Sequence, residues 1–464
     1  MHKIRLKNTT KEAIKVGIAV ASTILVSLWL GWDKSYWSAI TVFVVAANET
    51  YSHSIHKARN RLLGTVIGVV ASIFLLSQFP QDKVLFTLFY TLFMAFSAFM
   101  SVHKRYGYAF RTGFVVCVVI ASVSGFNADT SFAYSILRIQ ETVLGIVVYS
   151  VVFRFIWPKK TEDVFFEIMA LSTQHNRKKL RLITHNQLQS ATPEVIKDLE
   201  EESIAQISRL NKLDDILGLA LTDSSRLAYE RVYWRLIVKA LMQFEALMTQ
   251  KIQGEKIDSN IIVKGAKILS KSLCSPKSNN GELMRWCDEI EANYRIKKAP
   301  VSAFSAPVKQ RIIFTCKAVS ILLTSLAFWI YLPVPGSSMM PMVASVFAIV
   351  LAPMPSKAIK FTAICTAIWG VFFLAEFVFI IPAFTEAWQL ALLYLFNGIF
   401  IWKVSEAPSL QIQKSLAGNL SVVLCMGALQ SSPNFEITTP LMMLTVVFII
   451  LGIINFYNKL YRSV

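Results

Sequence analysis

Long blocks of apolar residues separated by short polar loops fill both ends of the chain. A helix needs about 20 apolar residues to cross a bilayer, and backbone groups inside lipid must pair within the helix, so each block predicts a transmembrane helix. Six blocks precede the middle of the chain, at about 13–31, 37–49, 61–79, 84–102, 108–126 and 133–157. Six follow it, at about 312–332, 337–354, 358–381, 387–402, 415–430 and 438–457. The pattern predicts an all-α polytopic membrane protein with about 12 transmembrane helices in two six-helix halves.

The middle of the chain is polar, but it keeps a helical period. A capping threonine, Thr161, starts a segment with early acids and apolar spacing, and Pro193 opens a second segment at the first helical position. The run after Ser225 is amphipathic at the same period. We therefore expect a bundle of four or five helices between the membrane halves. The predicted domains are 1–158, 159–308 and 309–464.

Charge placement gives the topology. The net charge is +18, which suits either nucleic acid or the cytoplasmic loops of a membrane protein. Lysine and arginine fall in alternate loops: before the first block, between the second and third, between the fourth and fifth, and after the sixth. The pattern predicts that both termini and the middle domain lie in the cytoplasm. It does not favour nucleic acid as a partner.

The two halves resemble each other. IKVGIAVASTILVSLWL (14–30) is similar to CKAVSILLTSLAFWIYL (316–332), with Lys15 and Lys317 at matching places. Because both halves begin on the same side, the repeat is parallel, as in many transporters whose substrates bind between the halves. The second block is short and ends near Glu49, and its counterpart is rich in proline. Such broken segments mark binding sites in transporters, although a kink tolerated by neighbouring helices gives the same pattern.

Ionisable residues inside the membrane are costly, so each is a candidate for a substrate or proton path. Arg138 and Glu141 lie one helical turn apart. They form either a purely structural pair or a site in which Arg138 holds a carboxylate substrate and Glu141 carries a proton. Glu376 is a second candidate proton carrier, and Glu49 is either a gate or a helix-end residue. Three cations lie near inner helix ends, and each is either a headgroup anchor or a contact for an anion: Lys15, Lys317 and Arg61.

Other chemistry receives little support from the sequence. The six cysteines form no CxxC pair, and His53 and His56 have no third ligand near them, so neither a metal nor a cofactor is expected. The chain carries no nucleotide-binding loop and no GxSxG, and we expect no catalytic residues and no enzyme activity. Tryptophans at block ends, Trp37 among them, fit an aromatic belt at the membrane surface.

Three segments resemble the fusaric acid resistance family, which includes aromatic carboxylic acid exporters. They are YWSAITVFVVA (36–46), RLLGTVIG (61–68) and RIQETVLGIVVYSVVFRFIWP (138–158). Their marks are Trp37, then Arg61 followed by Gly64, Thr65 and Gly68, then Arg138, Glu141, Gly145 and Pro158. The second half departs from the pattern: Lys360 replaces the arginine, and no Gly-Thr follows at the same offset.

The resemblance implies a location in the bacterial inner membrane and proton-driven efflux of small aromatic acids, with a periplasmic membrane-fusion adaptor as partner. A homo-oligomer is also compatible with the sequence. Two alternatives stay open from the residues alone. One is an organic-anion channel, as in the distantly similar plant malate channels. The other is a membrane scaffold whose cytoplasmic domain binds an envelope partner.

Overall fold

The computed structural model describes most of the chain. The described residues are 7–47, 51–124, 127–158, 160–184, 193–219, 221, 223–254, 257–274, 280–294, 304–332, 339–407 and 410–461. Within these ranges the secondary structure is helical, apart from one isolated β-bridge between His103 and Phe304. They divide into two compact units, one of membrane helices and one of polar helices. The all-α membrane fold predicted from the apolar blocks is confirmed.

Twelve helices of the described chain make up the membrane unit, six in each half. The first six are α1 (Asn8–Trp29), α2 (Tyr36–Ala46), α3 (Tyr51–Gln78), α4 (Lys83–Met100), α5 (Gly107–Ser124) and α6 (Ala128–Phe155). The second six are α13 (Val308–Tyr331), α14 (Met339–Leu351), α15 (Ser356–Ala375), α16 (Ala387–Val404), α17 (Gln411–Leu424) and α18 (Thr438–Leu460). The two groups coincide with the two sets of apolar blocks.

Eight of the described helices are long and apolar enough to cross a membrane alone. The remaining four, α2, α5, α14 and α17, are the second and fifth helices of each half. With 11 residues, α2 extends only about 17 Å at 1.5 Å per residue. Nearly all of its residues are buried, so its ends lie against protein rather than lipid. The second helix of each half is therefore short, with 11 residues in α2 and 13 in α14.

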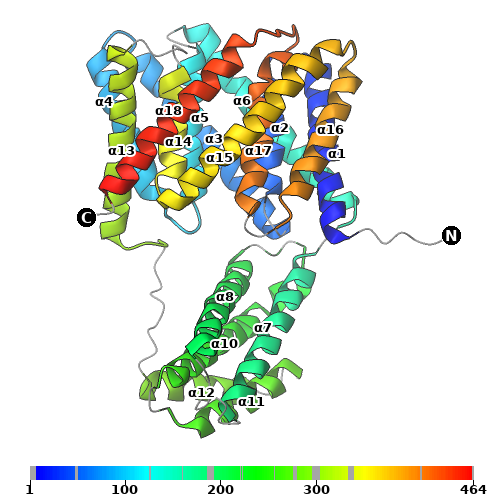
Figure 1. The fold of residues 1–464 in the computed structure, drawn as a ribbon, viewed down its shortest axis with the longest axis vertical. Coiled ribbons are helices and arrows are strands. Elements are labelled where there is room, and N and C mark those ends of the chain that lie inside the picture. The colour runs from blue at the N-terminus through cyan, green and yellow to red at the C-terminus, as the bar shows by residue number, and fades with distance from the viewer. Residues whose placement is uncertain are drawn as a thin grey trace, which may run out of the picture. The chain divides into compact units, whose positions relative to one another are not determined.

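The two halves interlock by exchanging helix partners. The first helix of each half packs against the fourth of the other, in the pairs α1–α16 and α13–α4. The second helix of each half contacts the fifth of the other, in the pairs α2–α17 and α14–α5. Figure 1 shows the pair α1–α16 on one side of the unit and the pair α4–α13 on the other. Two mixed groups result: set A holds α1, α2, α6, α15, α16 and α17, and set B holds α3, α4, α5, α13, α14 and α18.

Glycines allow the closest helix approaches. A methyl group at Gly17 of α1 would lie 2.5 Å from the carbonyl oxygen of Leu395 in α16, and Gly398 meets Gly17 from the opposite side. A methyl at Gly64 of α3 would lie 2.5 Å from the carbonyl oxygen of Ala109 in α5. Only residues without a side chain permit such contact, as in other membrane helix pairs.

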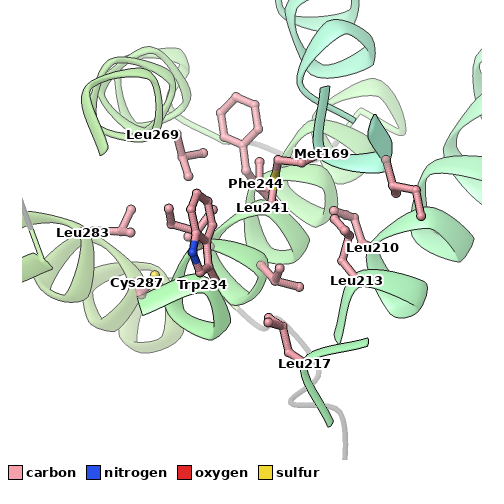
Figure 2. Packing of buried hydrophobic residues seen from close by; sticks show 14 of the residues in the cluster. Met169, Leu210, Leu213, Leu217, Trp234, Leu241, Phe244, Leu269, Leu283 and Cys287 are labelled. Atoms are coloured by element: carbon pink, nitrogen blue, oxygen red, sulfur yellow. The ribbon is translucent and has the colours of Figure 1, made fainter. Parts of the chain in front are cut away.

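The polar unit is a helical bundle with its own core. It contains α7 (Thr161–Thr184), α8 (Pro193–Gly218), α9 (Ser225–Tyr229), α10 (Arg231–Ile252), α11 (Ser259–Cys274) and α12 (Asn280–Asn293), together with residues 51–56. Figure 2 shows Trp234 and Phe244 of α10 among Met169 of α7, Leu269 of α11 and Leu283 of α12. The central α10 thus binds the surrounding helices into one core. The prediction of four or five helices misses the single-turn α9.

One buried ion pair lies within this bundle. Lys179 of α7 donates to Glu245 of α10 at 2.6 Å, and both side chains are buried. His175 lies 3.8 Å from the same carboxylate. Burial raises the pKa of Glu245, but the nearby His175 imidazole and the hydrogen-bonded Lys179 ammonium outweigh this effect and hold the pKa below its usual value. Glu245 therefore stays ionised in the folded bundle at neutral pH.

Candidate functional site

Arg138 and Glu141 are both buried in the membrane unit. The Nη1 atom of Arg138 lies 3.4 Å from Oε2 of Glu141, and the two residues are 7% and 0% exposed. The three-residue spacing places both side chains on one face of α6. The guanidinium lies over the ring of Trp37 in α2, 3.6 Å from its centroid. Trp37 was expected in the aromatic belt at the membrane surface, and here it stacks on the buried cation.

The pair uses only part of its hydrogen-bonding capacity. Within the described part of the chain, Nε of Arg138 and Oε1 of Glu141 are buried without a hydrogen-bond partner. A guanidinium offers five N–H donors and favours two parallel bonds to a carboxylate. One long contact to Glu141 leaves most of those donors for another acceptor. The arrangement is therefore chemically suited to a second carboxylate.

Beside this pair, polar contacts join α2 and α6 to α3 and α5. Near the middle of α6, the Thr142 hydroxyl lies 3.4 Å from the Thr65 hydroxyl of α3. One turn away on α3, the Nε atom of Arg61 donates to Thr41 of α2 at 3.1 Å. The Nη1 atom of Arg61 donates to the Tyr108 hydroxyl of α5 at 3.2 Å. Polar side chains of set A therefore meet polar side chains of set B.

We call this region the polar junction. It consists of Trp37, Thr41, Arg61, Thr65, Tyr108, Arg138, Glu141 and Thr142. The pseudo-equivalent place in the second half is apolar, because α18 carries Phe448 and Leu451 at the offsets at which α6 carries Arg138 and Glu141. The fold is duplicated, whereas the Arg138–Glu141 pair has no charged counterpart on α18.

The two matched lysines lie elsewhere. Lys15 of α1 donates to Glu12 at 2.6 Å and to the carbonyl oxygen of Trp157 at 3.4 Å. Trp157 follows Arg138 by 19 residues, a separation of roughly 28 Å at helical rise. Lys317 of α13 donates to the carbonyl oxygen of Ala352, just after α14. These contacts join helix ends in both halves, and they do not bring either lysine to Arg138.

Glu376 has a separate environment within set A. It begins a π-helical turn, Glu376–Ile380, that extends α15, and such turns often occur at functional positions. Its Oε2 accepts a hydrogen bond from Nδ2 of Asn397 in α16 at 2.8 Å, and both residues are buried. Glu49 lies outside the described residues. Among the residues that are described, no group of three His, Cys, Asp or Glu is placed to hold a metal ion.

Comparison with known proteins identifies the family. The model of the fusaric acid resistance protein family matches residues 12–253, just over half of the chain. The chain belongs to this family. An uncharacterized transporter of Gluconobacter oxydans (strain 621H) is 31% identical over 31% of this chain and 19% of its own. The uncharacterized transporter YdhK of Escherichia coli (strain K12) is 25% identical over 44% of this chain and 30% of its own.

A third relative has a more specific name. The p-hydroxybenzoic acid efflux pump subunit AaeB of Musicola paradisiaca (strain Ech703) is 26% identical over 29% of this chain and 22% of its own. The alignments span less than a third of the length of each of these relatives. No solved structure matches the chain.

The residues on which the resemblance to the fusaric acid resistance family depends have distinct physical roles here. Gly64 and Gly145 permit close helix contact: a methyl at Gly145 would lie 2.7 Å from the carbonyl oxygen of Ser38 in α2. Arg61, Arg138 and Glu141 supply the charges between those helices. The motif therefore encodes both the tight packing of α3 on α5 and of α6 on α2 and the charges that lie between these helices.

Sequence reasoning missed several members of the junction. Thr41 and Tyr108 were not predicted, because a threonine and a tyrosine in apolar blocks carry no charge signal. One signal was available: Lys57, Arg61 and Thr65 recur at four-residue spacing and so share a face of α3. That spacing indicates a polar stripe on an otherwise apolar helix.

Proposed function

We propose that this protein is a membrane transporter that exports small organic acids, aromatic carboxylates in particular, across the bacterial inner membrane. The observation that carries the proposal is the buried Arg138–Glu141 pair with its unused hydrogen-bonding atoms. A guanidinium binds a carboxylate in two parallel bonds, and Trp37 beside it offers an aromatic face to a ring-bearing substrate. The names of the relatives, two of them transporters and one an efflux pump subunit, support the same function.

The proposal includes coupling to protons. Glu141 and an incoming carboxylate compete for the same cation, so substrate can take Arg138 only when Glu141 gives up that contact. Protonation of Glu141 removes its charge and releases the arginine. Substrate binding and a protonation step are thereby linked at one pair of side chains. We also propose that both chain termini and the α7–α12 bundle lie in the cytoplasm, and that the partners include a periplasmic adaptor and further copies of this chain.

Transport into everted membrane vesicles tests the proposal. The vesicles contain the full chain, and labelled p-hydroxybenzoate is supplied with a proton gradient and after its collapse by a protonophore. We expect gradient-dependent accumulation that Arg138→Gln abolishes. Arg154→Gln is the matched control, because Arg154 is an exposed arginine on the same helix. Equal rates in vesicles with and without the chain, across a panel of aromatic acids, would refute the function.

The same preparation separates a carrier from a channel. In a planar bilayer without a proton gradient, a channel conducts a steady anion current. We expect no such current from this protein, because the Arg138–Glu141 pair is buried. A sustained current carried by p-hydroxybenzoate would replace the carrier proposal with an anion channel.

A further inference from the structure

A second group of cations lies beside the polar junction. Lys57 and Arg61 lie one turn apart on α3, and Arg111 projects from α5. Arg61 and Arg111 are both electrostatic neighbours of Lys57. We call these three residues the cationic cluster. All three are partly buried, whereas Arg59, between the two α3 cations, is exposed.

The cationic cluster has no compensating acid in the described chain. Among the residues that the structure describes, no carboxylate forms an ion pair with Lys57, Arg61 or Arg111. Two of them instead contact the side chain of Tyr108: Arg61 donates to the Tyr108 hydroxyl, and Nζ of Lys57 lies 5.4 Å from the centroid of the same ring. The buried Nε atom of Arg111 has no hydrogen-bond partner in the described chain.

Topology alone does not account for this arrangement. Positive charge at the cytoplasmic side requires only that cations occur near the helix ends, and exposed residues such as Arg59 and Arg105 meet that requirement. Turning three cations toward one another costs repulsion and desolvation. Stable clusters of this kind are balanced by an anion, and Arg and Lys with a hydroxyl donor are the usual ligands of carboxylate or phosphate.

We propose that the cationic cluster and the Tyr108 hydroxyl form a second anion-binding site, which receives the carboxylate of the transported acid before Arg138 does. The inference rests on the proposed function and adds an entry site to it. Arg61 belongs to both places, since it contacts Thr41 at the junction and is an electrostatic neighbour of Arg138. An anion can therefore pass from the cationic cluster to Arg138 while always facing a cation.

Equilibrium dialysis of labelled p-hydroxybenzoate against the full chain, held in phosphatidylcholine nanodiscs, tests the second site. The double variant Arg138→Met, Glu141→Gln serves as the background, because it removes the first site and leaves no unpaired buried charge. We expect this background to retain binding, and Arg111→Gln added to it to weaken binding about tenfold, the loss expected for one charge-assisted hydrogen bond. Arg111→Lys should retain most of the affinity, and Arg59→Gln should retain all of it. Gel filtration confirms that each variant is folded.

Each outcome decides the proposal. Equal affinity in the Arg111→Gln and Arg59→Gln variants would overturn it. If inorganic phosphate competes as well as p-hydroxybenzoate, the cluster is a general anion site. If binding is lost in phosphatidylglycerol nanodiscs, the cluster is a lipid headgroup site. Either result overturns the substrate assignment. The measurement needs no transport, so absence of flux in vesicles would refute the proposed function without deciding this site.

Discussion

Removing one charge of the buried pair should harm the fold, and removing both should not. The attraction between Arg138 and Glu141 at 3.4 Å is worth about 5 kcal/mol at an effective dielectric constant of about 20. Taking the two ions out of water costs several kcal/mol for each, so the net contribution of the pair is about zero. A single neutralisation leaves the other charge buried and should cost about 3–5 kcal/mol.

Three variants make this argument measurable. They are Arg138→Met, Glu141→Gln and the double variant. Glu141→Gln should be the milder single change, because an amide oxygen still faces the guanidinium, which also keeps its stack on Trp37. The double variant buries no charge and should lie within about 1 kcal/mol of the wild type. Apparent Tm in detergent should therefore rank the wild type and the double variant together, above both single variants.

Transport should rank the same variants differently. If Arg138 binds substrate, the double variant is stable but inactive in the everted-vesicle assay. That combination separates a functional pair from a structural one, which a single substitution cannot do. Wild-type transport by the double variant would remove the pair from the substrate path. A double variant as unstable as the single variants would show that the two charges do not act as a pair.

Three further predictions test other parts of the structure. Gly145→Leu should push α6 away from α2 and lower the apparent Tm, at a cost of about 1–3 kcal/mol or more. Gly452→Ala should leave the apparent Tm unchanged, because the space around Gly452 is open. Equal losses in the two variants would contradict the packing argument. The bundle should lose stability as pH falls below about 4.5, the ordinary carboxyl value, because the lowered pKa of Glu245 contributes stability only while it is ionised. Hydrogen exchange of α7 and α10 measures this loss, and Glu245→Gln should reduce its pH dependence. Glu376→Gln should keep its bond to Asn397 and the folded yield but slow gradient-driven transport; wild-type rates would exclude Glu376 from the proton path.

The apolar pattern predicts where the membrane helices lie, but not where every helix begins. It places the third block at 61–79, whereas α3 begins ten residues earlier, at Tyr51. The extra turns are polar, and a hydropathy pattern detects only the part of a helix that suits lipid. In the same way the apolar block at 358–381 hides the change from α-helix to π-helix at Glu376. Local polarity carries no signal for that change in winding.

The pairing of Arg138 with Glu141 follows from sequence, whereas their surroundings do not. A three-residue spacing fixes both on one helix face, whatever the fold. The stack on Trp37 depends on α2 packing against α6, and periodicity shows which face of a helix is buried but not which helix covers it. The exchange of partners between the halves is hidden for the same reason. Lys15 and Lys317 match in sequence, yet they contact different backbone segments.

The uneven use of the duplication bears on how such a protein could move. Sets A and B meet where α2 and α6 face α3 and α5, and again where α15 and α17 face α18. The first meeting place is the polar junction, whereas at the second the apolar side chain of Leu444 in α18 lies against Gly370 of α15. Apolar surfaces can shift against each other without breaking charged contacts, whereas opening the polar junction exposes ions that gain from water or from a carboxylate. A cycle in which one junction opens around substrate while the other stays packed therefore needs charges on only one side.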